Sequence, residues 1–292
     1  MSVARRRTDD SAMFTPVRRL LPLLLSGLLL VPLAGPVAAD DPGGTDPTAP
    51  PPVLPDQAWL TQAGFDLVTL ANSKRTHVGL VPLRMDPTLM SIARDRARVM
   101  AENQIMSHTE PDGTKVWDRI NEAGITWYAG GEIIAWNHYP LQYSPAEAIA
   151  AWWASPGHHS IMVSTGYNYF GFGAAVSADG KLYYAGVYLK MPDHTAPRAR
   201  FTRVSSYVVD ARHRRVTVYW GGSDVRLQTL TAGLYRYQVQ FRQVNHPWQR
   251  WTTTTGHKKA ITLVRGAHYE FRLHALDARG NWSPWRIIGI TG

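Results

Sequence analysis

Residues 144–159 read SPAEAIAAWWASPGHH, a stretch in which a helix start, an apolar helical pattern and two histidines follow one another. The Ser-Pro pair at 144–145 suits the first positions of a helix. The apolar residues Ile149, Trp152 and Trp153 recur behind it at helical spacing. We therefore expect an amphipathic helix here, packed on a core, with polar side chains directly after it.

Three more helices are expected in the first half of the chain. One covers about 57–76, one opens at Asp86-Pro87 and runs past Met100, and one covers 116–123 and stops at Gly124. Apolar runs at 130–136, 169–176 and 182–189 predict buried or half-buried strands. Helices in the first part and strands later imply an α+β layer domain.

The second half shows the alternation of strands with one buried face. Apolar and polar side chains alternate over 235–242 and 269–275, and turn signals lie at Gly221-Gly222 and Gly280-Asn281. About 100 residues of this kind resemble a fibronectin type III domain, most recognisably at Tyr269 and at ALDARGNWS, 275–283. We expect an all-β sandwich, which by itself implies no catalysis.

The first 39 residues have the organisation of a secretory signal. Five arginines precede an uncharged apolar run at 20–33, and Val37-Ala38-Ala39 offers the small residues of a cleavage site. The run is shorter than the roughly 20 apolar residues of a membrane span and contains Pro22 and Pro32. We expect cleavage after Ala39, no membrane span afterwards, and a secreted, extracellular protein.

Composition then divides the remaining chain into a linker and two domains of opposite charge. Residues 40–56 are a Pro/Gly-rich linker, and a second break at 191–197 separates an α+β domain at 57–193 from the β-sandwich at 194–292. Net charge is −6 over 40–193 and +12 over 194–292. The basic half suggests attraction to an anionic surface such as envelope polymers or lipid headgroups, whereas export argues against nucleic acid.

The chain contains no cysteine, which limits the chemistry it can carry. Disulfide scaffolds, cysteine-ligated zinc, iron–sulfur clusters and cysteine nucleophiles are excluded. Three polar elements in apolar surroundings remain: Ser107-His108, Gly131-Glu132 and the two histidines at 158–159. Imidazole and carboxylate groups can bind a divalent metal or exchange protons near neutral pH, although no H-E-x-x-H motif is present.

Several motifs in order resemble the bacterial branch of the CAP superfamily, which includes the cysteine-rich secretory proteins, antigen 5 and the pathogenesis-related class one proteins, and whose domain is also called SCP. The resemblance covers roughly 60–190. The motifs are Asn72-x-x-Arg75, Gly79-Leu80-x-Pro82-Leu83, Asp86-Pro87-x-Leu89, Ser107-His108, Gly131-Glu132 and Trp152-x-x-Ser155-Pro156-Gly157-His158. The resemblance implies an α–β–α sandwich with a central cleft of two histidines and two acidic residues, in which some members bind zinc.

Carried over by motif, the family's histidines match His108 and His158, and its first acidic residue matches Glu132. The second acidic position falls at or near Ser155, so the set of four is incomplete; Glu110 and Glu147 are possible substitutes. Consecutive helical side chains diverge by about 100°, so only one of the two adjacent histidines faces the cleft, and the motif favours His158.

These residues leave three functional hypotheses. The first is a cleft that binds zinc or a small apolar or lipid ligand through His108 and His158, with Glu132 nearby, on a protein positioned at the envelope by its basic domain. The second is a metal-dependent hydrolase of peptide or cell-wall bonds with Glu132 as general base. The third is a non-catalytic adhesion protein, in which the histidines and Glu132 only stabilise the fold.

The basic and aromatic residues of the second half also have a plain structural interpretation. Lys258-Lys259 and the segment 212–215 are expected to form a solvated face, and Trp248 and Trp251 to pack in the core rather than to stack on sugars.

Overall fold

The first domain consists of five helices and four strands in the computed structural model, which describes residues 54–292. The predicted signal and most of the predicted linker lie outside the described residues. The helices are α1 (Gln57–His77), α2 (Pro87–Asn103), α3 (Val116–Glu122), α4 (Ser144–Ala154) and α5 (Pro156–Met162). The strands are β1 (Arg84–Met85), β2 (Ala129–Asn137), β3 (Tyr169–Val176) and β4 (Leu182–Lys190).

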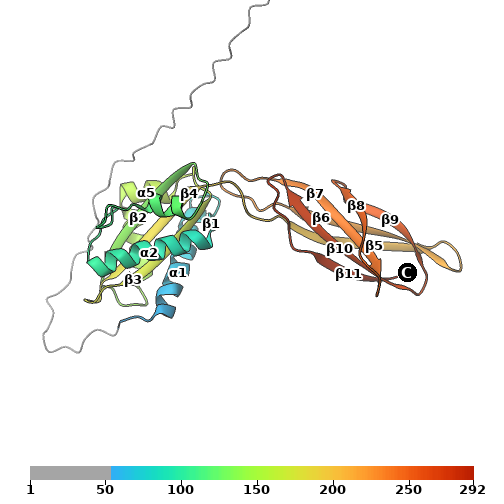
Figure 1. The fold of residues 1–292 in the computed structure, drawn as a ribbon, viewed down its shortest axis with the longest axis horizontal. Helices are drawn as coiled ribbons and strands as arrows, with labels where there is room; N and C mark the ends of the chain where they lie inside the picture. The colour runs from blue at the N-terminus through green and yellow to red at the C-terminus, as the bar shows by residue number, and fades with distance from the viewer. Residues whose placement is uncertain (1–53) are drawn as a thin grey trace, which may run out of the picture. The chain divides into compact units, whose positions relative to one another are not determined.

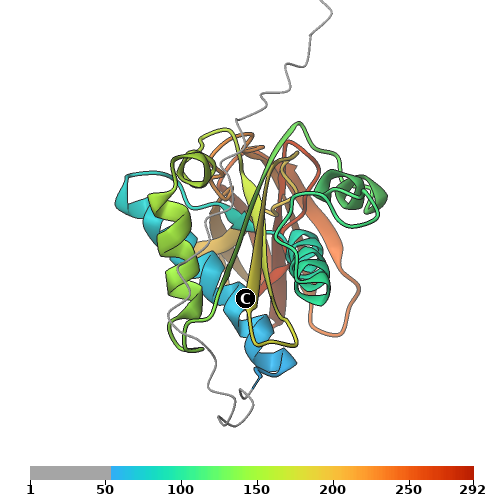
Figure 2. The same ribbon diagram turned by 90° about the vertical axis from the view of Figure 1, so that its left-hand side faces the viewer.

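The four strands form one sheet in the order β1-β3-β4-β2. Strand β1 is parallel to β3, and the other pairs are antiparallel. Figure 2 shows the sheet between two helical layers, with α1 and α4 on one face and α2 and α3 on the other. The predicted α–β–α sandwich is confirmed, and the elements that were expected lie within one or two residues of their ranges. Strand β1 and helix α5 were not predicted.

Both faces of the sheet are buried, so the strands read as apolar runs rather than as alternating ones. One face packs Phe170, Phe172 and Tyr188 against Trp152 of α4. The opposite face of β3 carries glycines at 171 and 173, where a Cβ would come within 2.2 Å and 2.1 Å of the α2 backbone. These glycines therefore let α2 lie directly on the sheet.

The two motif residues of α1, Asn72 and Arg75, have a structural role, because their side chains hydrogen bond to the backbone of neighbouring loops. Asn72 on α1 exchanges hydrogen bonds with the backbone of Leu83. Arg75 is fully buried, and its Nη1 donates to the carbonyl oxygens of Met162 and Ser164 at 2.7 Å and 2.9 Å. These two side chains fix the loops that follow α1 and α5.

The C-terminal half is an antiparallel β-sandwich, as predicted (Figure 1). One sheet has the order β5-β6-β9 and the other β11-β10-β7-β8. The strands are β5 (Arg198–Val208), β6 (His213–Ser223), β7 (Leu234–Gln243), β8 (Gln249–Thr254), β9 (Lys258–Val264), β10 (His268–Asp277) and β11 (Arg286–Thr291).

The inner faces of the two sheets supply the sandwich core. Trp220, Val239 and Phe271 are buried there, and the hydroxyl of Tyr269 accepts a hydrogen bond from the backbone N–H of Val264. This bond from a strand-start tyrosine to backbone a few residues upstream is the tyrosine corner of such sandwiches. No helix within residues 54–292 is long and apolar enough to cross a membrane.

A ladder of stacked rings and guanidinium groups covers the outer face of β10. His274 stacks between Trp282 and Trp285, at ring-centre distances of 4.0 Å and 3.6 Å. Arg272 lies 4.4 Å from the rings of both Trp285 and Trp248. The expectation that Trp248 packs in the core is therefore wrong, because its ring stacks with Arg272 on the outer face of the sheet.

The same expectation is confirmed for Trp251. Trp251 packs against the sandwich core, with its ring centre 5.2 Å from that of Phe271.

His274 makes the sandwich sensitive to acid. Burial, with the charge of Arg272, lowers the pKa of His274 from 6.5 to about 4, so the folded state binds this proton less readily than the unfolded chain. Stability should therefore fall by about 3 kcal/mol as the pH drops from 6.5 to 4. Denaturant unfolding across that range, compared with His274→Gln, measures this loss; equal pH dependence in both proteins would contradict it.

Candidate functional site

Arg96 of α2 ties together the segments that carry the predicted site. Its side chain is fully buried, and Nε donates to Oε1 of Glu132 at 2.8 Å. Its Nη1 donates to Oε1 of Glu110 at 2.9 Å, and Nη2 donates to the carbonyl oxygen of Ser107 at 2.8 Å. One guanidinium group thus joins α2, β2 and the loop that carries His108.

Two carboxylates compensate the buried charge of Arg96. Burial alone would lower its pKa, but Glu132 and Glu110 outweigh that effect and raise the pKa above its usual value. Glu110 also accepts bonds from Nε and Nη2 of Arg119, at 2.6 Å and 2.5 Å. Burial acts to raise the pKa of Glu110, yet the two arginines hold it below its usual range, so this carboxylate is engaged as an ion-pair partner.

His108 contacts the second oxygen of Glu132. The distance from His108 Nδ1 to Glu132 Oε2 is 2.7 Å, and the Glu132 side chain is 3% exposed against 33% for His108. Because a carboxylate only accepts, Nδ1–H of His108 donates, and in the neutral ring Nε2 then carries the lone pair. Both oxygens of Glu132 therefore have partners within the protein.

His158 lies on α5, which begins after the break at Ser155-Pro156. Its side chain is buried, and Nδ1 lies 3.0 Å from Oγ of Ser155. Burial lowers the pKa of His158, and the charge of His108 lowers it further. His158 is therefore neutral at pH 7, and its pKa responds to the charge of His108. Ser155, at the position expected for an acidic residue, anchors the second histidine.

His159 and Glu147, which the sequence analysis also considered, have other contacts. His159 hydrogen bonds through Nδ1 to the carbonyl oxygen of Trp153 at 2.9 Å, as expected for a histidine that turns away. Glu147 lines a separate cavity of about 280 Å³ with Trp136 and Tyr139. It precedes Ser155 on α4 by eight residues, or about 12 Å of helix.

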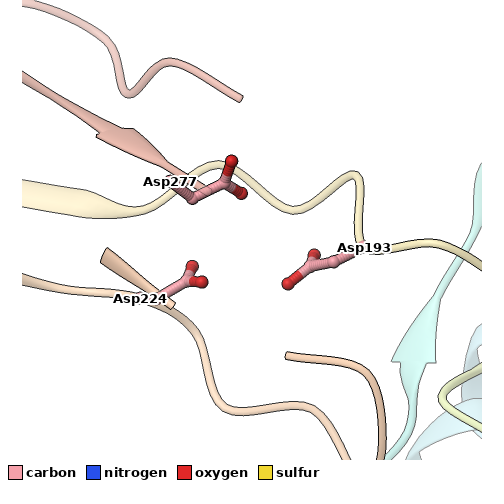
Figure 3. A group of neighbouring side chains, drawn as sticks. All are labelled: Asp193, Asp224 and Asp277. Atoms are coloured by element: carbon pink, nitrogen blue, oxygen red, sulfur yellow. The ribbon is translucent and has the colours of Figure 1, made fainter. Parts of the chain in front are cut away.

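A cluster of three aspartates joins the segment between the two domains, residues 191–197 and hereafter the linker, to the sandwich, and nothing in the sequence spacing indicates it. Asp193, Asp224 and Asp277 come from distant segments, yet they have carboxylate oxygens within 4.8 Å of one another (Figure 3). Burial and the two neighbouring carboxylates raise the pKa of Asp224. Carboxylates so arranged could hold a hard cation. All three also accept backbone N–H groups, including those of Ala232 and Asn281, so they hold the linker in place.

The comparison with known families agrees with the geometry. The model of the cysteine-rich secretory protein family, CAP, matches residues 68–188. Residues 68–188 form a CAP domain. The uncharacterized protein YkwD of Bacillus subtilis (strain 168) is 31% identical over 107 residues, which is 37% of this chain and 40% of the length of YkwD. The chain thus spans about two fifths of this curated relative.

Similarity to solved structures is lower. An outer surface protein from Borrelia burgdorferi is 24% identical with a TM-score of 0.39, over 44% of this chain and 91% of that one. An extracellular protein containing a SCP domain from Bacillus anthracis is 22% identical with a TM-score of 0.38, over 44% of this chain and 40% of that one.

The buried network makes Arg96 essential to the fold of the CAP domain. Arg96→Met should cost about 3–5 kcal/mol, because it leaves Glu132 buried without its guanidinium partner. Arg98→Ala, two residues away, breaks only exposed ion pairs with Asp95 and Glu102 and should cost less than about 1 kcal/mol. Denaturant unfolding of both variants measures the difference; equal midpoints would contradict the role given to Arg96.

Proposed function

We propose that the cleft of the CAP domain binds zinc through Nε2 of His108 and Nε2 of His158. The supporting observation is that each imidazole is anchored through its other nitrogen, His108 to Glu132 and His158 to Ser155. At His108 the Glu132 carboxylate can only accept, so the neutral ring carries its proton on Nδ1 and has Nε2 free for a metal. At His158 the Ser155 hydroxyl can donate or accept, so it holds the ring in place and leaves either nitrogen able to carry the proton. Imidazole is a common zinc ligand, and burial keeps His158 in the neutral form that a metal requires.

A site with two protein ligands leaves coordination positions open. When bound, zinc would supply a Lewis acid with room for water or a small ligand. His108, with a third of its side chain exposed, gives access from solvent, whereas buried His158 forms the inner wall. The proposed cleft therefore takes a small ligand beside the metal.

Glu132 supports binding better than hydrolysis. A general base needs an oxygen that can reach and accept a proton from water. Both oxygens of Glu132 are within 2.8 Å of Arg96 or His108, and its side chain is 3% exposed. In this proposal Glu132 orients His108 and does not act on a substrate.

We propose further that the protein is secreted and is held at the bacterial envelope by the β-sandwich. The arginine-rich start, the apolar run and the small residues before Asp40 support export. The charge of +12 on residues 194–292, against −6 on 40–193, supports attraction of the sandwich to an anionic surface. The acidic CAP domain would add nothing to that attraction.

The zinc site is tested by titrating the metal-free protein with zinc and measuring heat release and retained metal. The wild type should bind zinc, and His108→Ala combined with His158→Ala should abolish that binding. His159→Ala is the matched control, because its imidazole points to the Trp153 carbonyl and should leave zinc affinity unchanged. A wild type that retains no zinc, or a double variant that binds as tightly as wild type, would refute the proposed metal site.

A further inference from the structure

The hairpin between β5 and β6 ends in a group of exposed apolar side chains. Tyr207, Val208 and Val209 are 66%, 52% and 51% exposed, and Val264 on the neighbouring β9 is 51% exposed. His213 pairs with Val264, and the N–H of Val209 donates to the carbonyl oxygen of His213. We call these four apolar residues, with the turn at 210–212, the hairpin tip.

Sandwich packing does not account for these side chains. Alternate residues of a strand point to opposite faces, so three successive apolar residues cannot all reach the core. Farther along β6, Val216, Val218 and Trp220 show the usual alternation, with each buried. Contiguous exposed apolar groups at one end of a domain are typical of an interaction surface.

Arginines lie beside the apolar side chains of the tip. Arg215 is the cross-strand partner of Tyr207, and Arg214 is that of Val208. Arg212 is exposed in the turn, and Nη1 of Arg265 lies within 3.5 Å of the turn's carbonyl oxygens. The exposed apolar side chains of the hairpin tip are therefore accompanied by four arginines in the turn and on the adjoining strands.

The carboxylate in the turn, Asp210, does not pair with the side chains of these arginines. Asp210 accepts the backbone N–H groups of Arg212 and His213, at 2.7 Å and 2.8 Å, and also contacts the His213 ring. It shapes the turn, and none of the four arginines donates a side-chain bond to its carboxylate among the described residues.

We propose that the hairpin tip docks on an anionic lipid surface. Tyr207, Val208 and Val209 enter the boundary between headgroups and acyl chains, and the arginines bind the headgroup phosphates. Long arginine side chains can lie along apolar surface while their charged ends stay at headgroup level. Guanidinium groups bind phosphate oxygens in pairs, and each basic residue adds attraction to an anionic leaflet.

The apolar residues favour lipid over a soluble polyanion. A soluble anionic polymer would bind through the arginines alone, and exposed valines would add no binding free energy. Strand β5 carries the tip away from the linker, since its 11 residues span about 36 Å. This inference rests on the envelope-positioning part of the proposed function and names the surface and the partner.

Co-sedimentation of the purified protein with vesicles tests the apolar part. The protein should bind vesicles of phosphatidylglycerol and phosphatidylcholine, and not vesicles of phosphatidylcholine alone. Tyr207→Ser with Val209→Ser should weaken binding about tenfold. Tyr235→Ser is the matched control, because Tyr235 is 54% exposed near the linker end of the sandwich and should leave binding unchanged.

The same assay tests the basic part. Arg212→Gln with Arg215→Gln should weaken binding to the anionic vesicles about tenfold, and Arg198→Gln, at the linker end of β5, should have little effect. Binding should also fall strongly at about 0.5 M salt.

A fluorescent probe reports insertion directly. The chain has no cysteine, so Val209→Cys can be labelled at one position with an environment-sensitive dye. Its emission should shift to the blue with anionic vesicles, whereas dye on Tyr235→Cys should not respond. Absence of this shift overturns the inference, even if the tip variants fold poorly in the other assay.

Two further results also overturn it. One is failure to bind anionic vesicles; the other is vesicle binding that the apolar substitutions leave unchanged and that soluble polyphosphate abolishes. If the protein binds isolated cell walls but not vesicles, the lipid inference fails while envelope positioning stands. If it binds neither, envelope positioning fails as well.

Discussion

The ion pairs and hydrogen bonds of the fully buried Arg96 guanidinium are the interactions on which the CAP domain and its candidate site depend. A buried charge is tolerated only when hydrogen-bonding or charged partners compensate it. Here the partners are Glu132, Glu110 and the carbonyl oxygen of Ser107, which lie on different segments of the chain. The same bonds occupy one oxygen of Glu132 and direct the other to His108. Stability of the domain and orientation of the histidine thus come from one network.

Much of the fold could be predicted from the sequence. Helical spacing, the Asp86-Pro87 helix start and apolar strand runs locate the elements of the CAP domain, because each is a local consequence of side-chain periodicity. Alternation over 235–242 and 269–275 does the same for the sandwich. The ring ladder could not be predicted, since Trp248 meets Arg272 only after distant strands and loops pair.

The candidate site was proposed from residue type and motif, and the sequence did not show its contacts. His108, Glu132 and His158 follow from the ordered motifs, but the sequence shows no sign that Arg96 would take one oxygen of Glu132. Glu110 also looks like a spare acid until Arg96 and Arg119 are seen to hold both of its oxygens. Buried ion pairs between separate segments have no local signature. This is why residue patterns alone left the acidic candidates open.

The central claim is that His108 and His158 bind zinc together through Nε2. Correlation of the imidazole nitrogens with the ring protons by NMR, on the zinc-loaded protein at neutral pH, tests it most directly. The account predicts that both rings carry the proton on Nδ1 and bind the metal through Nε2. A proton on Nε2 of either residue in the zinc-loaded protein would contradict it.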